Sequence, residues 1–295
     1  MVEELVFENE RGDTLTFSPA SVYHVNMKDV AGLSDIRNYI FSVNSMWQHG
    51  DTYLGSRIEA REIEITGRLA IKDKEEAREA RRRLTRTLSP EFNARLQYRL
   101  GSFQRVIGCK IAHAPVFVKA PVFDTFVINL TCPSPFWRES THSRHDVAMW
   151  TGGLEFLLPN GLELINCLPW EIGTRNPYLL VNVFNAGDVS TGISIEFRAL
   201  GSVVNPLLMN IYTGEFVKMN FTMLAGDNIH IKTGFGEKNA FLTRHGETTN
   251  IFRHISHDST FLQLSTGDNV FKFDAEQNVD SLEVTVRHTN LFLGV

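Results

Sequence analysis

The sequence predicts a mainly β protein with one α-helix, built as two consecutive domains. Three observations favour this fold class. Residues 47–69 join a glycine-marked turn to a run in which apolar and charged side chains alternate. The second half of the chain divides into many short apolar segments separated by turns, and the composition holds 21 phenylalanines in 295 residues. Alternation with a period of two is typical of a strand with one buried and one solvated face, and aromatic residues are enriched in strands. A chain of this length commonly forms two domains of ordinary size.

The first 72 residues are predicted to form short strands. Turns are expected at Arg11-Gly12-Asp13 and at His49-Gly50-Asp51, where glycine supplies the conformational freedom that a tight turn needs. The alternating apolar positions after the second turn are Ile58, Ala60, Ile63 and Ile65. Their charged neighbours indicate that the opposite face of this strand is solvated.

One helix is predicted over residues 74–88. Asp73 is a suitable N-cap, Glu75 and Glu76 lie in the first turn, where the helix dipole favours acids, and Ser89-Pro90 ends the segment. The apolar residues that recur on one face are Ala77, Ala80, Leu84 and Leu88.

The same helix carries the arginines Arg78, Arg81, Arg82, Arg83 and Arg86. Glu79 and Arg83 have the favourable i to i+4 order, so a solvated face with ion pairs is the expected arrangement. The two alternatives are a subunit interface and a ring of arginines that faces passing DNA.

Strand character returns from Arg95 to Thr131. The apolar positions towards the end of this region are Val116, Val118, Val122, Phe126, Ile128 and Leu130, with Pro115 and Pro121 at the edges. Such a strand pair, at about 112–131, is too apolar to remain in water. It is therefore predicted to be a protruding hairpin that pairs with another molecule.

Residues 138–152 are polar and lack periodicity, which places a domain boundary there. The predicted division is a first domain at 1–138, a linker at 139–151 and a second domain at 152–295. Strands are expected in the second domain at residues 179–184, 193–197, 207–212, 216–223, 228–231, 250–253, 261–264, 270–273 and 282–288. Many short strands at a spacing of roughly 8 to 12 residues predict an antiparallel β-sandwich.

Composition argues against several classes of protein. The formal charge of −5 is too close to neutral to make nucleic acid or an anionic membrane the default partner. The three cysteines, Cys109, Cys132 and Cys167, lack CxxC spacing, so we expect small core residues in a reducing compartment. The acidic start does not match a secretory signal, and no apolar run reaches the length of a membrane span.

No motif in the sequence predicts catalysis, a cofactor or a metal. Gly234-Phe-Gly236 is half of a dinucleotide fingerprint without the following helix, and a hairpin turn is the better interpretation. The conceivable metal ligands are His113, His142, His145, Asp146, Cys109 and Cys132. Their spacing fits no tetrahedral zinc pattern. His254, His257 and Asp258 have the composition of a hydrolase triad but are expected to form a polar turn.

Three segments together resemble a known family. They are residues 47–69, Leu130 to Arg138 (LTCPSPFWR) and Ala199 to Glu215 (ALGSVVNPLLMNIYTGE). In order and spacing they are similar to the distal tail protein family of long-tailed phages, the hub component at the tip of a siphophage tail. Further matching positions are Gly50, an arginine at 57 or 61, Gly67, Gly201, Asn205-Pro206, Asn210, Gly214, Gly226-Asp227 and Gly267-Asp268-Asn269.

This resemblance implies an N-terminal β-sandwich with one helix and an extended hairpin, followed by a galectin-like antiparallel β-sandwich. It also implies a hexameric ring of N-terminal domains, closed by the hairpins as a belt. With the belt placed near 112–131, the expected ring-interface residues are Phe117, Val118, Val122, Phe123 and Phe126.

The implied partners are other copies of the chain, the tail tube protein, a tail-associated fibre or lysin protein, and a receptor-binding protein. DNA would pass through the ring without specific binding, and no membrane is involved. The implied location is the virion tail tip, after assembly in the bacterial cytoplasm. The pattern does not distinguish a phage from a prophage or a tail-like bacteriocin.

The alternative function is a carbohydrate-binding, lectin-like module that acts in adhesion to the host surface. Sugar sites usually combine exposed aromatic side chains with polar ones. Trp150 and Trp170 lie near the predicted domain boundary but form no clear cluster in the sequence.

Overall fold

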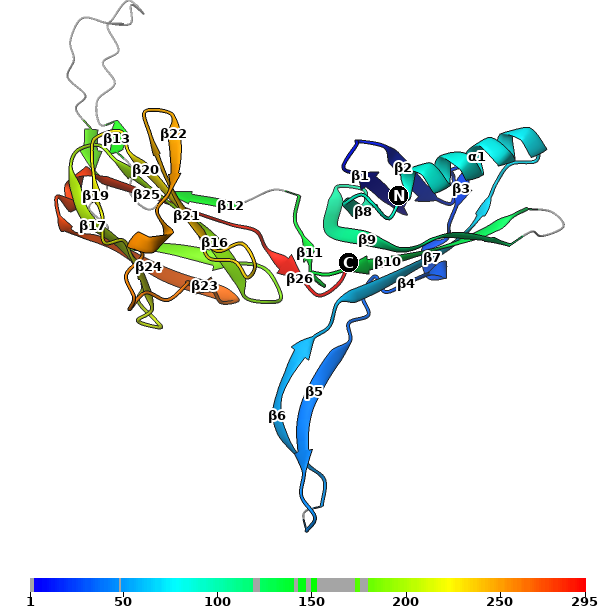
Figure 1. Cartoon of the computed structure of the whole chain (residues 1–295), viewed down its shortest axis with the longest axis horizontal. Coiled ribbons are helices and arrows are strands. Elements are labelled where there is room, and N and C mark those ends of the chain that lie inside the picture. Colours follow the sequence, from blue (N-terminus) through cyan, green and yellow to red (C-terminus); the bar gives the residue numbers. More distant parts are fainter. Residues whose placement is uncertain are drawn as a thin grey trace, which may run out of the picture. The chain divides into compact units, whose positions relative to one another are not determined.

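The computed structural model describes residues 3–47, 49–118, 123–140, 143–146, 150–152, 173–175 and 180–295. The chain forms two compact units (Figure 1): unit 1 contains Met1–Ser140 and Leu291–Val295, and unit 2 contains Thr141–Asn290. Strands dominate both units, and the described part of the chain has one α-helix. The predicted mainly β fold class is confirmed.

Unit 1 is built around one curved sheet. Its elements are β1 (Glu3–Asn9), β2 (Thr14–Ser18), β3 (Tyr23–His24), a 3-10 turn (Met27–Asp29), β4 (Val30–Ala31), β5 (Asn38–Asn44), β6 (Asp51–Ile58), β7 (Arg61–Leu69), α1 (Lys74–Thr87), β8 (Ala94–Leu100), β9 (Phe103–Val118), β10 (Thr125–Cys132), β11 (Trp137–Arg138) and β26 (Leu291–Phe292). The strand order is β10-β7-β3-β2-β1-β8-β9, and β9 also pairs with β10.

The sheet of unit 1 therefore closes on itself. The long strand β9 makes this possible, because its first half pairs with β8 and its second half pairs with β10. Closure satisfies the backbone groups that an open sheet leaves at its edges. The two layers that the resemblance implies for this half thus belong to one closed sheet.

The core of unit 1 follows the alternation in the sequence. In β7, Ile63, Ile65 and Leu69 are buried, while the charged residues between them are solvated. The aromatic rings of Phe17, Tyr23 and Phe126 pack at 6.0–6.2 Å between ring centres.

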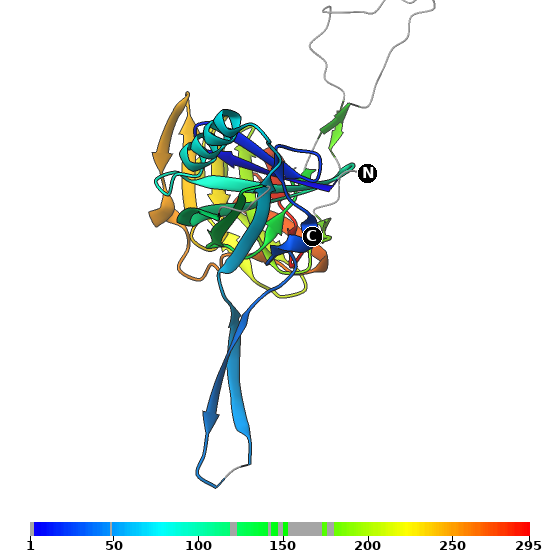
Figure 2. The same cartoon turned by 90° about the vertical axis from the view of Figure 1, so that its right-hand side faces the viewer.

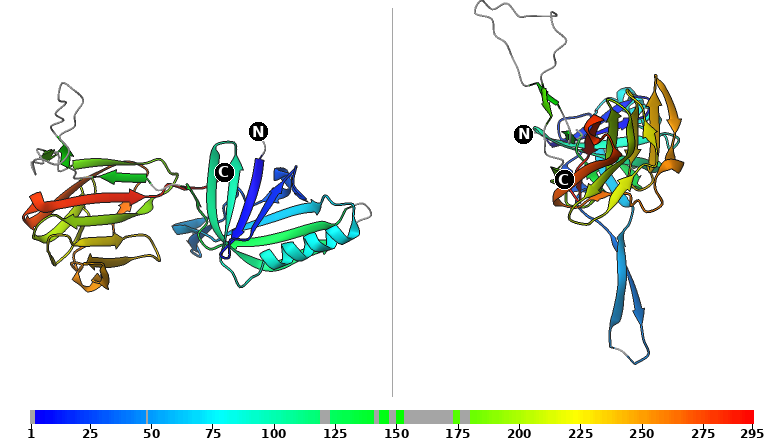
Figure 3. Two further views of the ribbon diagram at one scale, coloured as in Figure 1. Left: turned by 90° about the horizontal axis from the view of Figure 1, so that it is seen from above. Right: turned by 90° about the vertical axis from the view of Figure 1, so that its left-hand side faces the viewer.

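Helix α1 lies along the closed sheet (Figure 3) and begins and ends almost where the sequence predicts. The Asp73 carboxylate accepts hydrogen bonds from the backbone N–H groups of Glu75 and Glu76, at 3.1 and 3.0 Å. Leu84 is fully buried, and the Tyr23 hydroxyl donates to the Ala80 carbonyl at 3.0 Å. The cap and the apolar face together fix the helix on the sheet.

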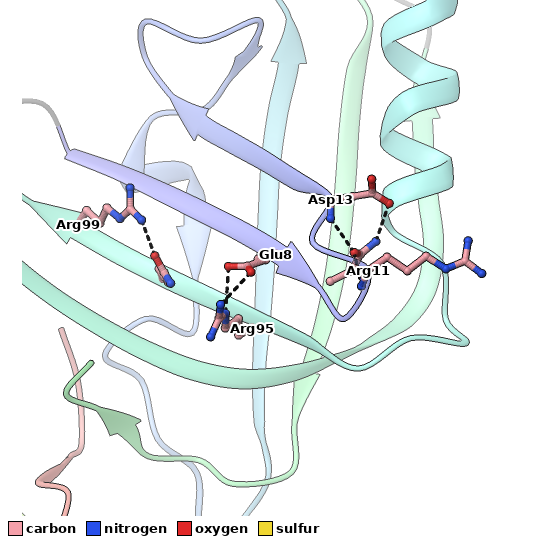
Figure 4. A network of polar contacts seen from close by, with 7 residues as sticks. Glu8, Arg11, Asp13, Arg95 and Arg99 are labelled. Carbon is pink, nitrogen blue, oxygen red and sulfur yellow. Dashed lines mark hydrogen bonds and ion pairs between the residues drawn. The ribbon is translucent and has the colours of Figure 1, made fainter. Parts of the chain in front are cut away.

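Ion pairs line the outer face of β1 and β8 (Figure 4). The Arg95 guanidinium donates two hydrogen bonds to the Glu8 carboxylate, at 2.8 and 3.0 Å. Arg99 lies 3.7 Å from Glu4 on the same two strands. Hydrogen bonds from Arg95 hold the pKa of Glu8 below its usual value. At the adjacent predicted turn, the Asn9 side chain accepts from the backbone N–H groups of Arg11 and Asp13, both at 3.0 Å.

The predicted protruding hairpin at 112–131 is wrong in its position. These residues belong to β9 and β10, and β10 pairs with β7 on its other side from Arg61 to Arg68. In β10 the side chains of Phe126, Ile128 and Leu130 are buried in the core of the closed sheet, whereas Val116 and Val118 of β9 are exposed. The hairpin that does extend from unit 1 is β5–β6.

Unit 2 contains the remaining strands. They are β12 (Ser143–Asp146), β13 (Trp150–Gly152), β14 (Gly173–Arg175), β15 (Leu180–Asn185), β16 (Thr191–Ala199), β17 (Val203–Asn210), β18 (Phe216–Lys218), β19 (Thr222–Met223), β20 (Asn228–Lys232), β21 (Asn239–Arg244), β22 (Glu247–Asn250), β23 (Gln263–Leu264), β24 (Gly267–Gln277) and β25 (Leu282–His288), with 3-10 turns at Phe252–His254 and Val279–Ser281.

Two antiparallel sheets share the core of unit 2. One has the order β12-β25-β16-β20-β21-β22, and the other has the order β15-β24-β17-β18. Residues from both sheets, such as Phe197 and Phe271, belong to one buried cluster. The galectin-like detail implied by the resemblance stays a prediction.

Two local predictions for the second half fail. Residues 239–244, not predicted as a strand, form β21, which pairs with β22 across a turn in which His245 and Gly246 have positive φ. Residues 250–253, predicted as a strand, contain only the last residue of β22 and most of a 3-10 turn. The strand predicted at 282–288 is β25 with the same bounds.

The end of the chain returns to unit 1. There β26 pairs with β11, with Trp137 opposite Phe292 and Arg138 opposite Leu291. The Arg105 guanidinium lies 3.2 Å from the centre of the Phe292 ring. The sequence analysis assigns residues 291–295 to the second domain, whereas the structure groups them with unit 1. Independent folding of the two halves stays a prediction.

The Asp227–Arg244 pair yields a test of the stability of unit 2. Asp227 is buried and accepts two hydrogen bonds from Arg244, at 2.7 and 2.5 Å, and one from the Leu224 backbone N–H, at 2.8 Å. The hydrogen bonds from Arg244 lower the pKa of Asp227. Because the folded-state pKa is lowered, the stabilisation is complete above the unfolded pKa of about 3.9 and is lost as the pH falls below it.

We expect Asp227→Asn to lower the free energy of unfolding at pH 7 by about 1.5–3 kcal/mol, the usual value of hydrogen bonds to charged groups. The variant should also lose part of the acid dependence between pH 5 and 2. Urea unfolding across this pH range measures both effects. Glu276→Gln, at the pair with Lys218, is the matched control and should leave the free energy of unfolding nearly unchanged.

Candidate functional site: the exposed hairpin and its arginine anchor

The hairpin β5–β6 extends away from the closed sheet of unit 1 (Figure 2), and its two strands pair with each other alone in the described part of the chain. Every residue of β5 is exposed. Its large exposed side chains, with their exposed fractions, are Tyr39 (49%), Ile40 (58%), Phe41 (44%), Val43 (53%), Tyr53 (63%) and Leu54 (65%).

Both faces of the hairpin are apolar. Tyr39 and Phe41 lie on one face, where their rings meet edge to face at 4.9 Å, with the Arg57 guanidinium 5.9 Å from the Tyr39 ring. Ile40 and Ser42 lie on the opposite face, because side chains two residues apart in a strand share a face. Tyr53 lies on that face too, because it is directly opposite Ser42. A two-stranded ribbon in water is marginal at best, and its solvated face is normally polar. This hairpin is therefore suited to burial against another molecule.

The predicted turn at His49-Gly50-Asp51 lies at the tip of this hairpin. Gly50 has a φ of +77°, which glycine adopts without strain. Next to it, Met46 and Trp47 are 91% and 94% exposed. Aromatic side chains of this kind often carry much of the binding energy in protein interfaces.

The buried guanidinium of Arg61 lies at the base of the hairpin. It donates to five backbone carbonyls: Gly32 (2.7 Å), Leu33 (3.0 Å), Asp35 (3.1 Å), Pro135 (2.8 Å) and Leu293 (2.5 Å). The planar fork of arginine suits several acceptors at once, as lysine does not. One side chain thus connects the segment leading into β5, the segment before β11 and the end of the chain.

Two neighbours restrict the same region. Gly32 has a φ of +86°, and a Cβ atom there would lie 2.0 Å from the Glu62 carbonyl oxygen. The Trp137 indole N–H donates to the Leu33 carbonyl at 2.9 Å, and the Trp137 side chain is fully buried. These contacts fix the backbone at Gly32 and Leu33, in the segment that leads into the hairpin.

Burial affects the chemistry of this anchor. It lowers the pKa of Arg61, although arginine stays protonated at physiological pH, and raises the pKa of the nearby Cys132 thiol to about 12. Cys109 is buried as well, and burial also raises its pKa. Both cysteines are free and buried, as the sequence predicts, and a thiol with a raised pKa is a poor nucleophile. Cys167 lies outside the described residues.

A cavity of about 360 Å³ lies beside the hairpin base. It is lined by the 31–37 segment and by the outer faces of β7, β9 and β10, including His113 and Asn129. Asp35, Glu62 and Glu64 are its acids, and Arg37 forms an ion pair with Glu62 at 3.3 Å. Both polar and apolar residues line the cavity.

The ring-interface residues predicted from the sequence have different environments. Phe126 is fully buried in the core of unit 1, and Phe117 packs partly against that core. Phe123 is half-buried beneath the Arg68 guanidinium, 5.6 Å from its ring centre. Val118 is 54% exposed, whereas Val122 lies outside the described residues. Phe126 is part of the hydrophobic core of unit 1. A contribution of the predicted residues to ring contacts stays a prediction.

The sequence analysis missed β5 as an interaction element. Its residues, NYIFSVN, are apolar on both faces and carry no charge. They therefore lack the alternation of apolar and polar residues that indicates a half-buried strand. The available signal was this two-faced apolar pattern next to the predicted turn at Gly50. Arg61 was recognised only as an arginine that opens a strand.

The arginine-rich face of α1 forms ion pairs. Arg78 pairs with Glu75 at 3.6 Å within the helix, and Arg81 pairs with Asp124 outside it. The Arg83 guanidinium lies 3.4 Å from the Thr14 carbonyl. The predicted solvated face is present, although Arg83 contacts the sheet.

The candidate metal ligands do not converge where the structure describes them. Within the described residues, no three His, Cys, Asp or Glu side chains are placed to hold a metal ion. His254 is half-buried, while His257 and Asp258 are exposed at a surface turn. His142 and Trp170 lie outside the described residues, and nothing is described of the Trp150 side chain. The carbohydrate-binding alternative stays a prediction.

Residues 186–292 match the family described as siphovirus-type tail component, C-terminal domain. This part of the chain is therefore a siphovirus-type tail component domain, and the resemblance to the distal tail protein family is confirmed. No curated protein sequence gives a significant match.

Solved structures are similar over nearly the whole chain. The Dit (gp 19.1) protein of phage SPP1, described as a paradigm of the hub adsorption apparatus in phages that infect Gram-positive bacteria, has a TM-score of 0.70 at 14% identity, covering 98% of this chain and 99% of that one. A chain of the phage P2 baseplate in its activated conformation with calcium has a TM-score of 0.52 at 11% identity, covering 98% of both chains. At these identities the likeness defines the fold.

The one described α-helix is too short and too polar to cross a membrane.

Replacement of Arg61 tests the anchor. Arg61→Met should lower the free energy of unfolding by about 3 kcal/mol, because four partly buried carbonyls would lose this donor and the Leu33 carbonyl would keep only the Trp137 donor. Arg61→Lys should recover only part of this loss, since one ammonium cannot reach all five acceptors. Urea unfolding measures the stability, and hydrogen exchange should increase at residues 32–35 and 291–295.

Arg57→Met, on the exposed hairpin, is the matched control and should change stability by less than about 0.5 kcal/mol. Equal effects of the two methionine substitutions would contradict the anchoring role of Arg61.

Proposed function

We propose that this protein is the structural hub of a siphophage-type tail tip, and that its copies form a closed ring through the β5–β6 hairpin. The observation that carries the proposal is the hairpin itself, which has two apolar faces, exposed edges and an anchored base. The tail-component domain at residues 186–292 and the likeness of fold to a phage hub protein support the same role.

A hairpin that extends from one copy onto the next makes a head-to-tail contact. Such contacts generate rings when the rotation closes and open filaments when it does not. The contacts of Arg61 and Trp137 with residues 32–35 restrain the segment before the hairpin, which favours a fixed rotation between copies. The number six follows from the resemblance and is part of the proposal.

The ring would join the tail tube protein to a tail-associated fibre or lysin protein and leave a channel for DNA. Unit 2 would be available to further tail components, such as a receptor-binding protein. The work of the chain is then mechanical and adhesive, without bond chemistry. It is carried out at the virion tail tip after assembly in the bacterial cytoplasm.

Two pairs of substitutions with similar exposure test which hairpin closes the ring. Ile40→Asp with Val43→Asp places a charge on each face of β5, and these residues are 58% and 53% exposed. Val116→Asp with Val118→Asp alters the hairpin first predicted from the sequence, at 52% and 54% exposure. All four side chains are solvated in the single chain, so folding should be preserved.

Native mass spectrometry should show a ring for the wild type and for the Val116/Val118 variant, and smaller species for the Ile40/Val43 variant. The reverse result would return the ring contact to β9 and β10. A wild type that stays monomeric at all concentrations would refute the ring.

A further inference from the structure

The cavity beside the hairpin base has a floor that four strands build. The register places Ala31 of β4 and Asn129 of β10 opposite Glu64 of β7, and it places His113 of β9 opposite Asn129. Residues that are directly opposite each other in neighbouring strands lie on the same face of a sheet. Glu64, Asn129 and His113 therefore form a polar row across the outer face of the closed sheet.

Small residues keep this cavity open. Four of its lining residues, Ala31, Gly32, Ala60 and Ala112, carry no side chain beyond Cβ. The three alanines are exposed, and their methyl groups leave the space of about 360 Å³ unfilled. The cavity thus combines exposed methyl groups with the polar row.

The polar row has unused hydrogen-bonding capacity. In the part of the chain that the structure describes, the side chains of Glu64 and Asn129 make no hydrogen bond, and Glu64 makes no ion pair. The nearby cations are already engaged, because Arg37 pairs with Glu62 and Arg61 donates to five backbone carbonyls. The Glu64 carboxylate is therefore available to a hydrogen-bond donor that enters the cavity.

The tip of the hairpin carries a suitable donor. Trp47 is 94% exposed, and Met46 beside it is 91% exposed. An indole combines a large apolar ring with a single N–H donor, so it favours a site that offers both apolar contacts and an acceptor. The Trp47 side chain is therefore chemically complementary to the cavity.

The tip cannot enter the cavity of its own chain. Strands β5 and β6 have seven and eight residues and pair along their whole length, which separates tip and base by about 25 Å at roughly 3.4 Å per residue. The cavity lies at the base, because Arg37 just before β5 and Ala60 just after β6 line it. Figure 2 shows the tip at the far end of the extended hairpin. A contact between Trp47 and the cavity must therefore join two copies.

We propose that the cavity at the hairpin base receives Trp47 from the hairpin tip of a second copy, with the indole N–H donating to the Glu64 carboxylate. This inference rests on the proposed ring and identifies the surface that completes it. A head-to-tail contact needs two different surfaces, and each copy must carry both. Tip and cavity meet this requirement within unit 1. All copies then face the same way along the ring axis, which leaves the ring two different faces for other tail proteins.

Cross-linking of the full chain tests the contact directly. The double variant Met46→Cys with Ala112→Cys leaves Trp47 and Glu64 unchanged and is treated with a short bismaleimide. We expect a denaturing gel to show a ladder of linked chains that ends at the number of copies in the ring. Either substitution alone should give no more linked product than the wild type. Met46→Cys with Arg82→Cys, at an exposed site of α1 outside the cavity lining, is the control and should give no ladder.

Filling the cavity tests its role in assembly. Ala112 and Ala114 are both exposed on β9, and Ala112 lines the cavity whereas Ala114 does not. Ala112→Phe and Trp47→Ala should each raise the protein concentration for half assembly about tenfold or more, because aromatic side chains in pockets carry much of the binding energy. Ala114→Phe is the matched control and should leave this concentration unchanged. Native mass spectrometry over a dilution series measures it, and urea unfolding should give the wild-type midpoint for all three variants.

The inference is overturned if the wild type forms rings while the Met46/Ala112 variant links no more chains than the Met46/Arg82 control. Equal assembly of Ala112→Phe and Ala114→Phe would have the same consequence. The ring would then stand, and its cavities would be open to a different tail component. A wild type that stays monomeric removes the ring itself, so the failure of this contact and the failure of the proposed function are distinguishable.

Discussion

The buried guanidinium of Arg61 is the interaction on which unit 1 depends. It satisfies five backbone carbonyls from three separate parts of the chain, and none of its acceptors is a carboxylate. A buried charge is costly unless it is fully hydrogen-bonded, and here backbone carbonyls supply the hydrogen bonds. The arrangement makes one side chain responsible for the path into the hairpin, the position of the segment before β11 and the docking of the chain end.

The distribution of open and closed edges gives the molecule its interaction sites. The sheet of unit 1 closes through β9 and so offers few backbone groups to a partner. The exposed apolar surface of that unit is concentrated in β5–β6, where both faces are uncovered. In the described part of unit 2, β15 is an uncharged edge strand with β24 as its one strand partner. A protein that works within an assembly can keep such surfaces because they are covered there.

The sequence predicts elements whose structure is local and leaves open those that depend on distant partners. Helix α1 and β25 appear where expected. The signals for them, namely an N-cap, a regular apolar face and an alternation of buried and solvated residues, all come from residues that are close in sequence. The sequence analysis places the extending hairpin at 112–131, whereas the structure places it at β5–β6. Both strand pairs are apolar, and what distinguishes them is the long-range pairing of β10 with β7. The hydrogen bonds of Arg61 could not be predicted from the sequence for the same reason, because one of its acceptors is the carbonyl of the distant residue Leu293.

The return of β26 to unit 1 makes unit 2 an insertion between two neighbouring strands. During synthesis the ribosome therefore releases the last piece of unit 1 only after all of unit 2 has been made. Until then Arg61 lacks the Leu293 carbonyl and β11 lacks its partner strand. A chain cut short by premature termination keeps an incomplete hairpin base, and such fragments would be poor competitors for places in the growing particle.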